Sequence, residues 1–211
     1  MTETTQQTFA DFDVDARIVE ALASKGIEHP FPIQAMTLPV ALAGHDIIGQ
    51  AQTGTGKTLG FGIPALQRVV APGEDGYEDL PHPGAPQALI VAPTRELAVQ
   101  VADDLTLAAS KRSVRIATIY GGRAYEPQIE QLAKGVDVVV GTPGRLIDLN
   151  RQRHLNLSAV RIVVLDEADE MLDLGFLPDV ERLIAAVPEV RQTMLFSATM
   201  PGPCLLYTSL S

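Results

Sequence analysis

Two groups of residues in this 211-residue chain have the types and spacing needed for chemistry on a triphosphate. The first is a glycine-rich loop, Ala51-Gln-Thr-Gly-Thr-Gly-Lys-Thr58, and the second is Asp166-Glu-Ala-Asp169, which directly follows the apolar run 161–165. A loop of this kind can wrap a triphosphate with its N–H groups. Carboxylates at a strand end can hold the metal and orient a water. Together the two groups predict hydrolysis of a nucleotide.

Within the loop, Gly54 and Gly56 allow backbone conformations that other residues resist, so successive N–H groups can converge on phosphate oxygens. A helix that starts near Lys57 would add its positive dipole end. We expect Lys57 to reach the β and γ phosphates and the Thr58 hydroxyl to bind Mg²⁺. The alternative is a glycine-rich turn that happens to contain Gly-Lys-Thr. The candidate nucleotide contacts here are Gln52, Thr53, Gly54, Thr55, Gly56, Lys57 and Thr58.

The acidic group follows a predicted strand, so its carboxylates are expected at the strand's carboxyl end. Asp166 is placed to take a water of the Mg²⁺ shell, and Glu167 to orient and deprotonate the attacking water. The alternative is an ordinary helix start, because acids are favoured in first turns. The candidate catalytic residues are therefore Lys57, Asp166 and Glu167, and the candidate metal ligands are Thr58 and Asp166.

Composition limits the other possibilities. Hydrophobic residues make up 46% of the chain and charged residues 20%. The sequence contains no run of about 18 apolar residues, the length that a membrane-spanning helix needs. The polar start at 1–8 does not resemble a signal peptide, and the single Cys204 fits a reducing cytoplasm. The net charge of −10 argues, by itself, against a nucleic-acid partner, which normally needs clustered Lys and Arg.

Short apolar runs alternate with amphipathic stretches, which predicts an α/β fold with a mostly parallel central sheet covered on both faces. The glycine-rich segment 71–87, with four acids, is expected to be a mobile surface loop, and Gly26 to cap the first helix. The expected strands are 46–49, 88–92, 114–119, 136–140, 162–165 and 193–196, and the expected helices are 14–25, 34–43, 57–69, 95–109, 125–134 and 178–186.

The order of short motifs resembles the DEAD-box RNA helicases, over their first RecA-like domain. The resemblance covers about residues 9–203, and bacterial members look most similar. It implies a three-layer RecA-like P-loop NTPase fold, with a polar tail at 1–8 and a non-family tail at 204–211. The matching motifs are Phe9, Gly26–Gln34, the phosphate loop, Pro93–Ala98, Gly121-Gly122, Thr142–Arg145, the acidic box and Ser197–Thr199.

The resemblance implies that ATP is the nucleotide. Gln34, in the family's Q motif, would bond to the adenine edge, although an N-terminal helix residue after Pro32 is the alternative. Ile27 stands where the family often has an aromatic residue against the base, which weakens stacking. No Asn-Lys-x-Asp guanine signature occurs, so a GTPase is poorly supported.

The resemblance also implies a sequence-independent contact with the RNA backbone. Hydroxyls, loop N–H groups and guanidiniums suit phosphates, although single residues here could serve only as caps, turns or solvated charges. Ser197 and Thr199 would bond to Asp169 and link nucleotide state to strand separation, or be two buried hydroxyls after a strand. The candidate RNA contacts are Thr94, Arg95, Gly122, Arg123, Thr142 and Arg145.

Family members carry a second RecA-like domain, and the family pattern here stops at Pro203. Because arginine fingers from that domain are worth about 10³–10⁵ in rate, we expect this chain alone to bind ATP–Mg²⁺ weakly, to hydrolyse it slowly and not to unwind duplexes. The leading interpretation is the ATP-binding domain of an ATP-dependent RNA helicase in the cytoplasm. The alternatives are a non-catalytic module that binds ATP or RNA, and another P-loop ATPase of the same superfamily that acts on DNA.

Overall fold

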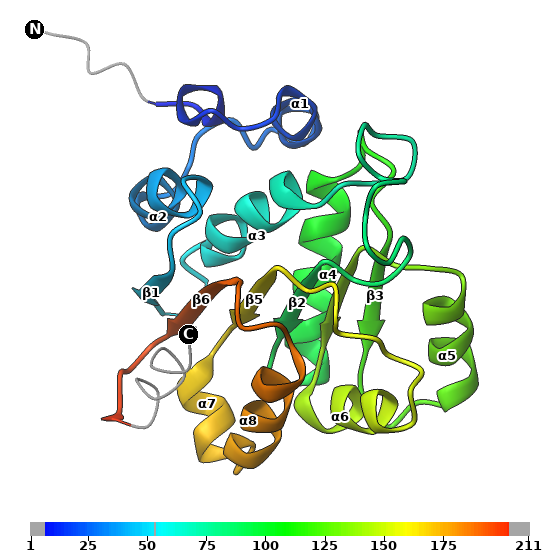
Figure 1. Cartoon of the computed structure of the whole chain (residues 1–211). Coiled ribbons are helices and arrows are strands. Elements are labelled where there is room, and N and C mark those ends of the chain that lie inside the picture. The colour runs from blue at the N-terminus through cyan, green and yellow to red at the C-terminus, as the bar shows by residue number, and fades with distance from the viewer. Residues whose placement is uncertain (1–6, 53, 203–211) are drawn as a thin grey trace, which may run out of the picture.

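The computed structural model describes residues 7–52 and 54–202. A six-stranded sheet lies at its centre, with helices on both faces (Figure 1). The strands are β1 (Ile47–Gln50), β2 (Ala88–Val91), β3 (Ile116–Ile119), β4 (Val138–Gly141), β5 (Ile162–Leu165) and β6 (Gln192–Ser197).

All six strands run parallel, in the order β1-β6-β5-β2-β4-β3. Every residue of β2, β4, β5 and β6 is buried, because both faces of a parallel sheet are covered. Alternate strand residues point to opposite faces, so Ile90 and Val164 join one core while Leu89 and Val163 join the other.

Four helices cover the first face: α1 (Ala16–Ala23), α2 (Pro32–Leu42), α3 (Lys57–Arg68) and α4 (Arg95–Ala108). A short 3-10 helix at Phe9–Phe12 precedes them and buries Phe9 in the same core. The first helix ends as expected for a glycine cap, since Gly26 has a φ of 73° and Ile27 N donates to the carbonyl of Leu22.

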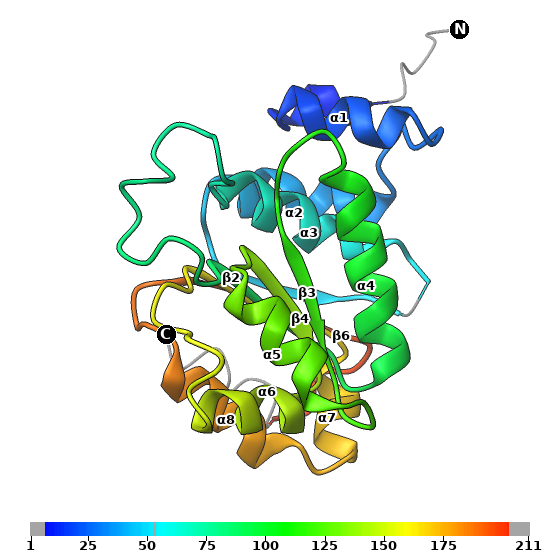
Figure 2. The ribbon, with the colours of Figure 1, turned by 90° about the vertical axis from the view of Figure 1, so that its right-hand side faces the viewer.

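The second face is covered by α5 (Tyr125–Ala133), α6 (Pro143–Arg151), α7 (Ala168–Asp173) and α8 (Leu177–Ala186). Figure 2 shows the sheet between the two groups of helices. Neither α6 nor α7 is among the helices expected from sequence. Pro143 is the first residue of α6, a position where its missing N–H costs nothing, so the Pro-Gly pair begins a helix here.

The segment 71–87 has no helix or strand, as expected, but it is anchored to the domain. Tyr77 is buried, and its hydroxyl accepts a 2.7 Å hydrogen bond from Arg115. Glu74 pairs with Arg112 at 2.6 Å and with Arg17 at 2.7 Å. These contacts anchor the first half of the segment to the domain, and the mobility expected from the sequence stays a prediction.

The two tails expected from the sequence lie mostly outside the described residues: 1–6 of the N-terminal tail and all of 204–211. Among the helices of 7–52 and 54–202, none combines the length and apolar character that crossing a bilayer requires.

Candidate active site

The glycine-rich loop connects the end of β1 to the start of α3. Gly54 and Gly56 have φ angles of 83° and 76°, in the left-handed region that glycine adopts without a steric penalty. The Thr55 hydroxyl donates a 2.7 Å hydrogen bond to the carbonyl of Gln52, which closes the loop on itself. Thr53 lies outside the described residues. The geometry accounts for both glycines.

Gly56 is also restricted by its neighbours. A Cβ there would lie 2.4 Å from the ring of Phe31 and 2.9 Å from the side-chain nitrogen of Gln34. Phe31 precedes α2 and Gln34 lies in its first turn, so the phosphate loop packs against the start of this helix. Position 56 therefore needs glycine both for its positive φ and for lack of space. Any larger residue at position 56 would displace Phe31 or Gln34.

Lys57 and the two acids meet in the interior, although more than a hundred residues separate them in sequence. Lys57 Nζ lies 3.0 Å from Asp166 Oδ1 and 2.5 Å from Glu167 Oε1. All three side chains are at most 5% exposed. Within the described chain the ammonium has ion pairs but no well-aligned hydrogen bond. The two carboxylates hold it by charge at short distance, so an incoming anion would have to compete with them for the ammonium.

Burial dominates the electrostatics of Asp166. It raises the pKa of this carboxyl to about 6, against the opposing effect of the Lys57 ammonium. Its Oδ1 accepts a 3.0 Å hydrogen bond from Glu167 N, whereas Oδ2 has no hydrogen-bond partner in the described chain. Glu167 itself has a φ of 50°, which is uncommon for a non-glycine residue. Such strained residues concentrate at functional sites.

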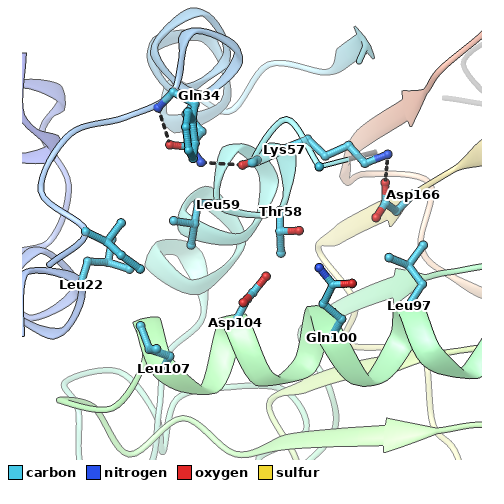
Figure 3. A pocket seen from close by; sticks show the side chains of 14 residues that line it. Leu22, Gln34, Lys57, Thr58, Leu59, Leu97, Gln100, Asp104, Leu107 and Asp166 are labelled. Carbon is cyan, nitrogen blue, oxygen red and sulfur yellow. Dashed lines mark hydrogen bonds and ion pairs between the residues drawn. The ribbon is translucent and has the colours of Figure 1, made fainter. Parts of the chain in front are cut away.

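A cavity of about 280 Å³ opens beside these groups, between α1, α3 and α4 (Figure 3). Thr58 and Gly56 line its polar end together with Lys57 and Asp166. The other end has mainly aliphatic walls, with one half-buried carboxylate, Asp104. Its aliphatic lining residues are Leu22, Ile27, Leu59, Leu97 and Leu107.

Gln34 lines the same cavity but has little free surface, because its residue is only 1% exposed. Its Oε1 accepts a 2.9 Å hydrogen bond from Phe31 N, and its Nε2 donates to the carbonyl of Gly56 at 2.5 Å. Figure 3 shows the amide between α2 and the loop. Gln34 thus ties the phosphate loop to α2 with one amide N–H and one oxygen lone pair, and the second N–H and second lone pair make no hydrogen bond in the described chain. Ile27, on the cavity wall, supplies an aliphatic surface for a base.

Asp169, Ser197 and Thr199 are in contact. Asp169 N donates to Ser197 Oγ at 3.0 Å, and the Thr199 N–H and hydroxyl each donate to Asp169 Oδ2 at 2.8 Å. These bonds connect Asp169, in the first turn of α7 and two residues after Glu167, with the end of β6 and the residues that follow it. A role in coupling strand separation to nucleotide state stays a prediction.

The expected RNA-contacting residues follow three strands that are neighbours in the sheet, β2, β4 and β3. Thr94 caps α4, accepting a 3.3 Å hydrogen bond from Leu97 N, and the Arg95 side chain is 58% exposed. Thr142 is the N-cap residue of α6, without a side-chain cap bond. The loop after β3 exposes Gly122 and Arg123. Parallel strands therefore bring all these segments to one edge of the sheet.

Arg145 is different from the other five, because it is only 8% exposed. Its Cζ lies 3.8 Å from the centre of the Tyr125 ring, and one of its nitrogens donates a 3.0 Å hydrogen bond to the carbonyl of Arg123. Its other terminal nitrogen has no hydrogen-bond partner in the described chain. The sequence offered no sign of this burial, since arginine is rarely buried.

The donor set fits a magnesium–triphosphate group better than a metal bound by protein alone. The described residues hold no cluster of three or more His, Cys, Asp or Glu side chains that could bind a metal. Mg²⁺ prefers one or two carboxylates, with waters and phosphate oxygens as the other ligands. The unpaired Oδ2 of Asp166 and the nearby hydroxyl of Thr58 match that preference.

A comparison with protein families matches residues 31–205 to the model described as "DEAD/DEAH box helicase". This chain belongs to that family. An ATP-dependent RNA helicase, RhlB, from Proteus mirabilis is 47% identical over 199 residues, which is 93% of this chain and 45% of the relative. A DEAD-box ATP-dependent RNA helicase, CshA, from Bacillus licheniformis is 46% identical over 198 residues, covering 93% and 38%.

Among solved structures, a DEAD box protein from the hyperthermophile Methanococcus jannaschii superposes with a TM-score of 0.86 at 40% identity. The match covers 96% of this chain and 53% of that one. The RecA-like fold is therefore as expected. The chain spans less than half the length of the two curated relatives named above.

Sequence reasoning missed several side-chain contacts of the DEAD/DEAH box motifs. Gln128 is 3% exposed and bonds to the loop that follows β3, and Tyr125 stacks on Arg145. Phe31 lies over the phosphate loop. A buried glutamine on a polar helix leaves no periodic pattern, so only its proximity to the Gly121-Gly122 pair could have pointed to it.

Proposed function

We propose that residues 9–203 form the ATP-binding domain of an ATP-dependent RNA helicase, with ATP and Mg²⁺ as its ligands. The single observation that supports this most is the meeting of Lys57 with Asp166 and Glu167 beside a cavity lined by the phosphate loop. We further propose a cytoplasmic protein whose full-length form couples RNA-stimulated ATP hydrolysis to local duplex separation.

The loop N–H groups of 52–56, the start of α3 and Lys57 would hold the phosphates, and Thr58 and Asp166 would hold the metal, partly through water. When bound, Mg²⁺ neutralises phosphate charge and acts as a Lewis acid. Lys57 must then exchange part of its ion pairing from the two acids to phosphate oxygens. That exchange would end the 2.5 Å contact of Glu167 with the ammonium, and we assign to this carboxylate the acceptance of a proton from the attacking water.

Gln34 would select adenine while keeping the loop joined to α2. Because the Gln34 amide also bonds to the Gly56 carbonyl, binding of a base to this amide would affect the position of the phosphate-binding backbone. This proposal includes Ile27 as the aliphatic surface beneath the base, in place of an aromatic ring.

RNA would bind along the ends of β2, β4 and β3, through Thr94, Arg95, Gly122, Arg123 and Thr142, with Arg145 beneath. Such contacts recognise the backbone and the 2′-hydroxyl rather than base sequence. The bonds among Asp169, Ser197 and Thr199 lie between this surface and the nucleotide loop, because β6 is between β1 and β5.

The decisive experiment compares three variants for ATP binding and hydrolysis in the presence of Mg²⁺. We expect Glu167→Gln to retain ATP binding and to lower hydrolysis by about 10²–10⁴-fold, the usual contribution of a positioned base. Lys57→Ala should lose both. Glu170→Gln is the matched control, since its acid is in the same helix as Asp169 but makes no ion pair in the described chain. Unchanged turnover in Glu167→Gln would disprove the catalytic assignment.

A second measurement addresses the nucleic acid. Binding of single-stranded RNA and of DNA of the same sequence should differ in favour of RNA. Equal affinity would instead support a DNA-directed ATPase of the same superfamily, and no binding of either would leave an ATP-binding module.

A further inference from the structure

The loop that follows β3, residues 120–124, is held to the domain from below by two buried side chains. Gln128 Oε1 accepts a 3.1 Å hydrogen bond from Tyr120 N, and its Nε2 donates at 3.2 Å to the carbonyls of Tyr120 and Ala124. Arg145 donates at 3.0 Å to the carbonyl of Arg123. Three of the five loop carbonyls therefore bond to side chains in the interior.

The N–H groups of the same loop are in the opposite situation. Gly121, Gly122, Arg123 and Ala124 are exposed, and none of their N–H groups has a hydrogen-bond partner in the described chain. Gly122 has a φ of 77°, and a Cβ on either glycine would meet nothing within 4 Å. With its carbonyls bonded inward, the loop presents donors outward, an arrangement suited to an anion.

Arg145 is itself fixed from two sides. Its guanidinium stacks at 3.8 Å on Tyr125, whose hydroxyl bonds to Asp148 at 3.0 Å. No ion pair to Arg145 occurs among the described residues. A buried cation without an acidic partner is costly. An anion bound on the loop above it would offset that cost at close range.

We propose that Gln128 and Arg145 are positioning residues for RNA: they act on a backbone phosphate through the loop of residues 120–124. Arg145 stays beneath that loop, stacked on Tyr125, and adds charge rather than a direct contact. This inference depends on the proposed function, because the anion is taken to be an RNA phosphate.

The test uses the whole chain and a fluorescent oligouridine at several salt concentrations. Gln128→Leu removes all three loop bonds without removing a charge, so we expect about tenfold weaker RNA binding, equivalent to one lost charge-assisted hydrogen bond. The salt dependence should be unchanged, since no cation is lost. Gln131→Leu is the matched control: it makes the same change in the same helix, where the side chain bonds to Ile116 in β3 instead.

Arg145→Lys separates positioning from direct contact. A lysine keeps the charge and can bind a phosphate, but it lacks the planar group that stacks on Tyr125 and donates to the Arg123 carbonyl. We expect Arg145→Lys to bind RNA as weakly as Gln128→Leu, and the double variant to be little weaker than either, because both act on one loop. Wild-type affinity in Arg145→Lys would overturn the positioning role and favour direct contact.

Two readouts exclude a general loss of structure. ATP affinity should stay at the wild-type value in all these variants. Amide hydrogen exchange of Tyr120, whose N–H donates to Gln128 Oε1, should become faster without RNA in Gln128→Leu and stay unchanged in Gln131→Leu. If the loop exchanges faster but the wild-type chain binds no RNA, the RNA assignment fails while the loop's dependence on Gln128 stands. If exchange and RNA binding in Gln128→Leu both match the wild type, the inference is wrong.

Discussion

At the scale of single residues, the centre of the site is an ammonium between two carboxylates in a place nearly closed to water. Taking charges out of water is expensive unless they are paired. Lys57 stabilises the two acids in the ligand-free chain, and in the proposed function it would also pair with the phosphates. The same arrangement makes Asp166 responsive to pH.

We expect Mg²⁺-dependent ATP binding to weaken as pH falls through about 6. Below that value Asp166, whose pKa burial raises to about 6, takes up a proton and can no longer hold the metal shell. Affinity should be complete above pH 7 and should fall by about tenfold for each pH unit below the pKa. Calorimetric titration at several pH values on both sides of 6 measures the ATP affinity. Asp166→Asn should remove this component and leave only the titration of the nucleotide; a flat profile in the wild type would contradict the assignment.

Lys57→Met should destabilise the ligand-free chain, because it leaves two buried carboxylates without their cation. The loss at neutral pH is expected to be on the order of 3 kcal/mol, as for other broken buried ion pairs. It should shrink in mildly acidic solution, where Asp166 is protonated. Denaturant unfolding at the two pH values tests this, and adding Asp166→Asn to the variant should recover part of the loss. Equal stability of Lys57→Met and the wild type would show that the pair contributes nothing.

At the scale of elements, close helix packing determines where the phosphate loop can lie. In α3, a Cβ at Gly62 would lie 2.5 Å from the side chain of Leu105 in α4, and one at Gly60 would lie 2.9 Å from the Thr37 hydroxyl in α2. These glycines bring α3 against both neighbours. Together with the Gln34 bond to Gly56, they place the start of α3 under the loop.

Gly62→Ala should therefore destabilise the chain by about 1–3 kcal/mol, the usual cost of overpacking, despite alanine's better helix propensity. Gly144→Ala is the matched control in α6, where the new methyl group meets nothing within 4 Å; we expect no cost or a small gain. Thermal unfolding of both variants gives the comparison. A stabilised Gly62→Ala would mean that α3 and α4 can separate without penalty.

The sequence predicted the strands and the motifs at their ends. It did not predict which side chains are buried under those motifs. Strands such as 162–165 are buried on both faces. They are therefore continuous apolar runs, which can be recognised in the sequence without knowledge of their neighbours in the fold. Helix α7 has only six residues and follows Glu167, whose φ is positive; the acids of its first turn were the one helix signal there, and they gave only an alternative interpretation. Arg145 and Gln128 are buried because they contact the loop at 120–124. The spacing of residues along the sequence does not predict such contacts.

At the scale of the whole molecule, the acids of segment 71–87 and the proposed RNA surface lie at opposite ends of the strands. Segment 71–87, which holds four acids, precedes β2; Glu74 pairs with Arg112, a few residues before β3, and Gly84 accepts a bond from Val136 N, just before β4. The expected RNA contacts follow β2, β3 and β4, at the opposite ends of these strands. The net charge of −10 is therefore compatible with a local RNA site, because exposed charges farther apart than about 10 Å are screened at moderate salt.

Glu74 should make the stability of the fold sensitive to acid. Hydrogen bonds from Arg112 and the charges of Arg112 and Arg17 lower its pKa to about 2. Because the folded pKa lies below the ordinary value of 4.5, this contribution is complete above pH 4.5 and is lost as pH falls toward 2. Unfolding free energy measured across this range should decline less steeply in Glu74→Gln than in the wild type. Glu78→Gln, at an exposed acid in the same segment, should follow the wild-type curve.

The position of β6 has a consequence for synthesis on the ribosome. This strand comes last among the six but is inserted between β1 and β5, so the phosphate loop and the two acids cannot reach their final spacing until residues 192–197 have left the exit tunnel. A nascent polypeptide halted before that point should be unable to retain ATP, however long it waits. The ability to bind nucleotide would then arrive abruptly, within the translation of a few codons, and not grow in proportion to chain length.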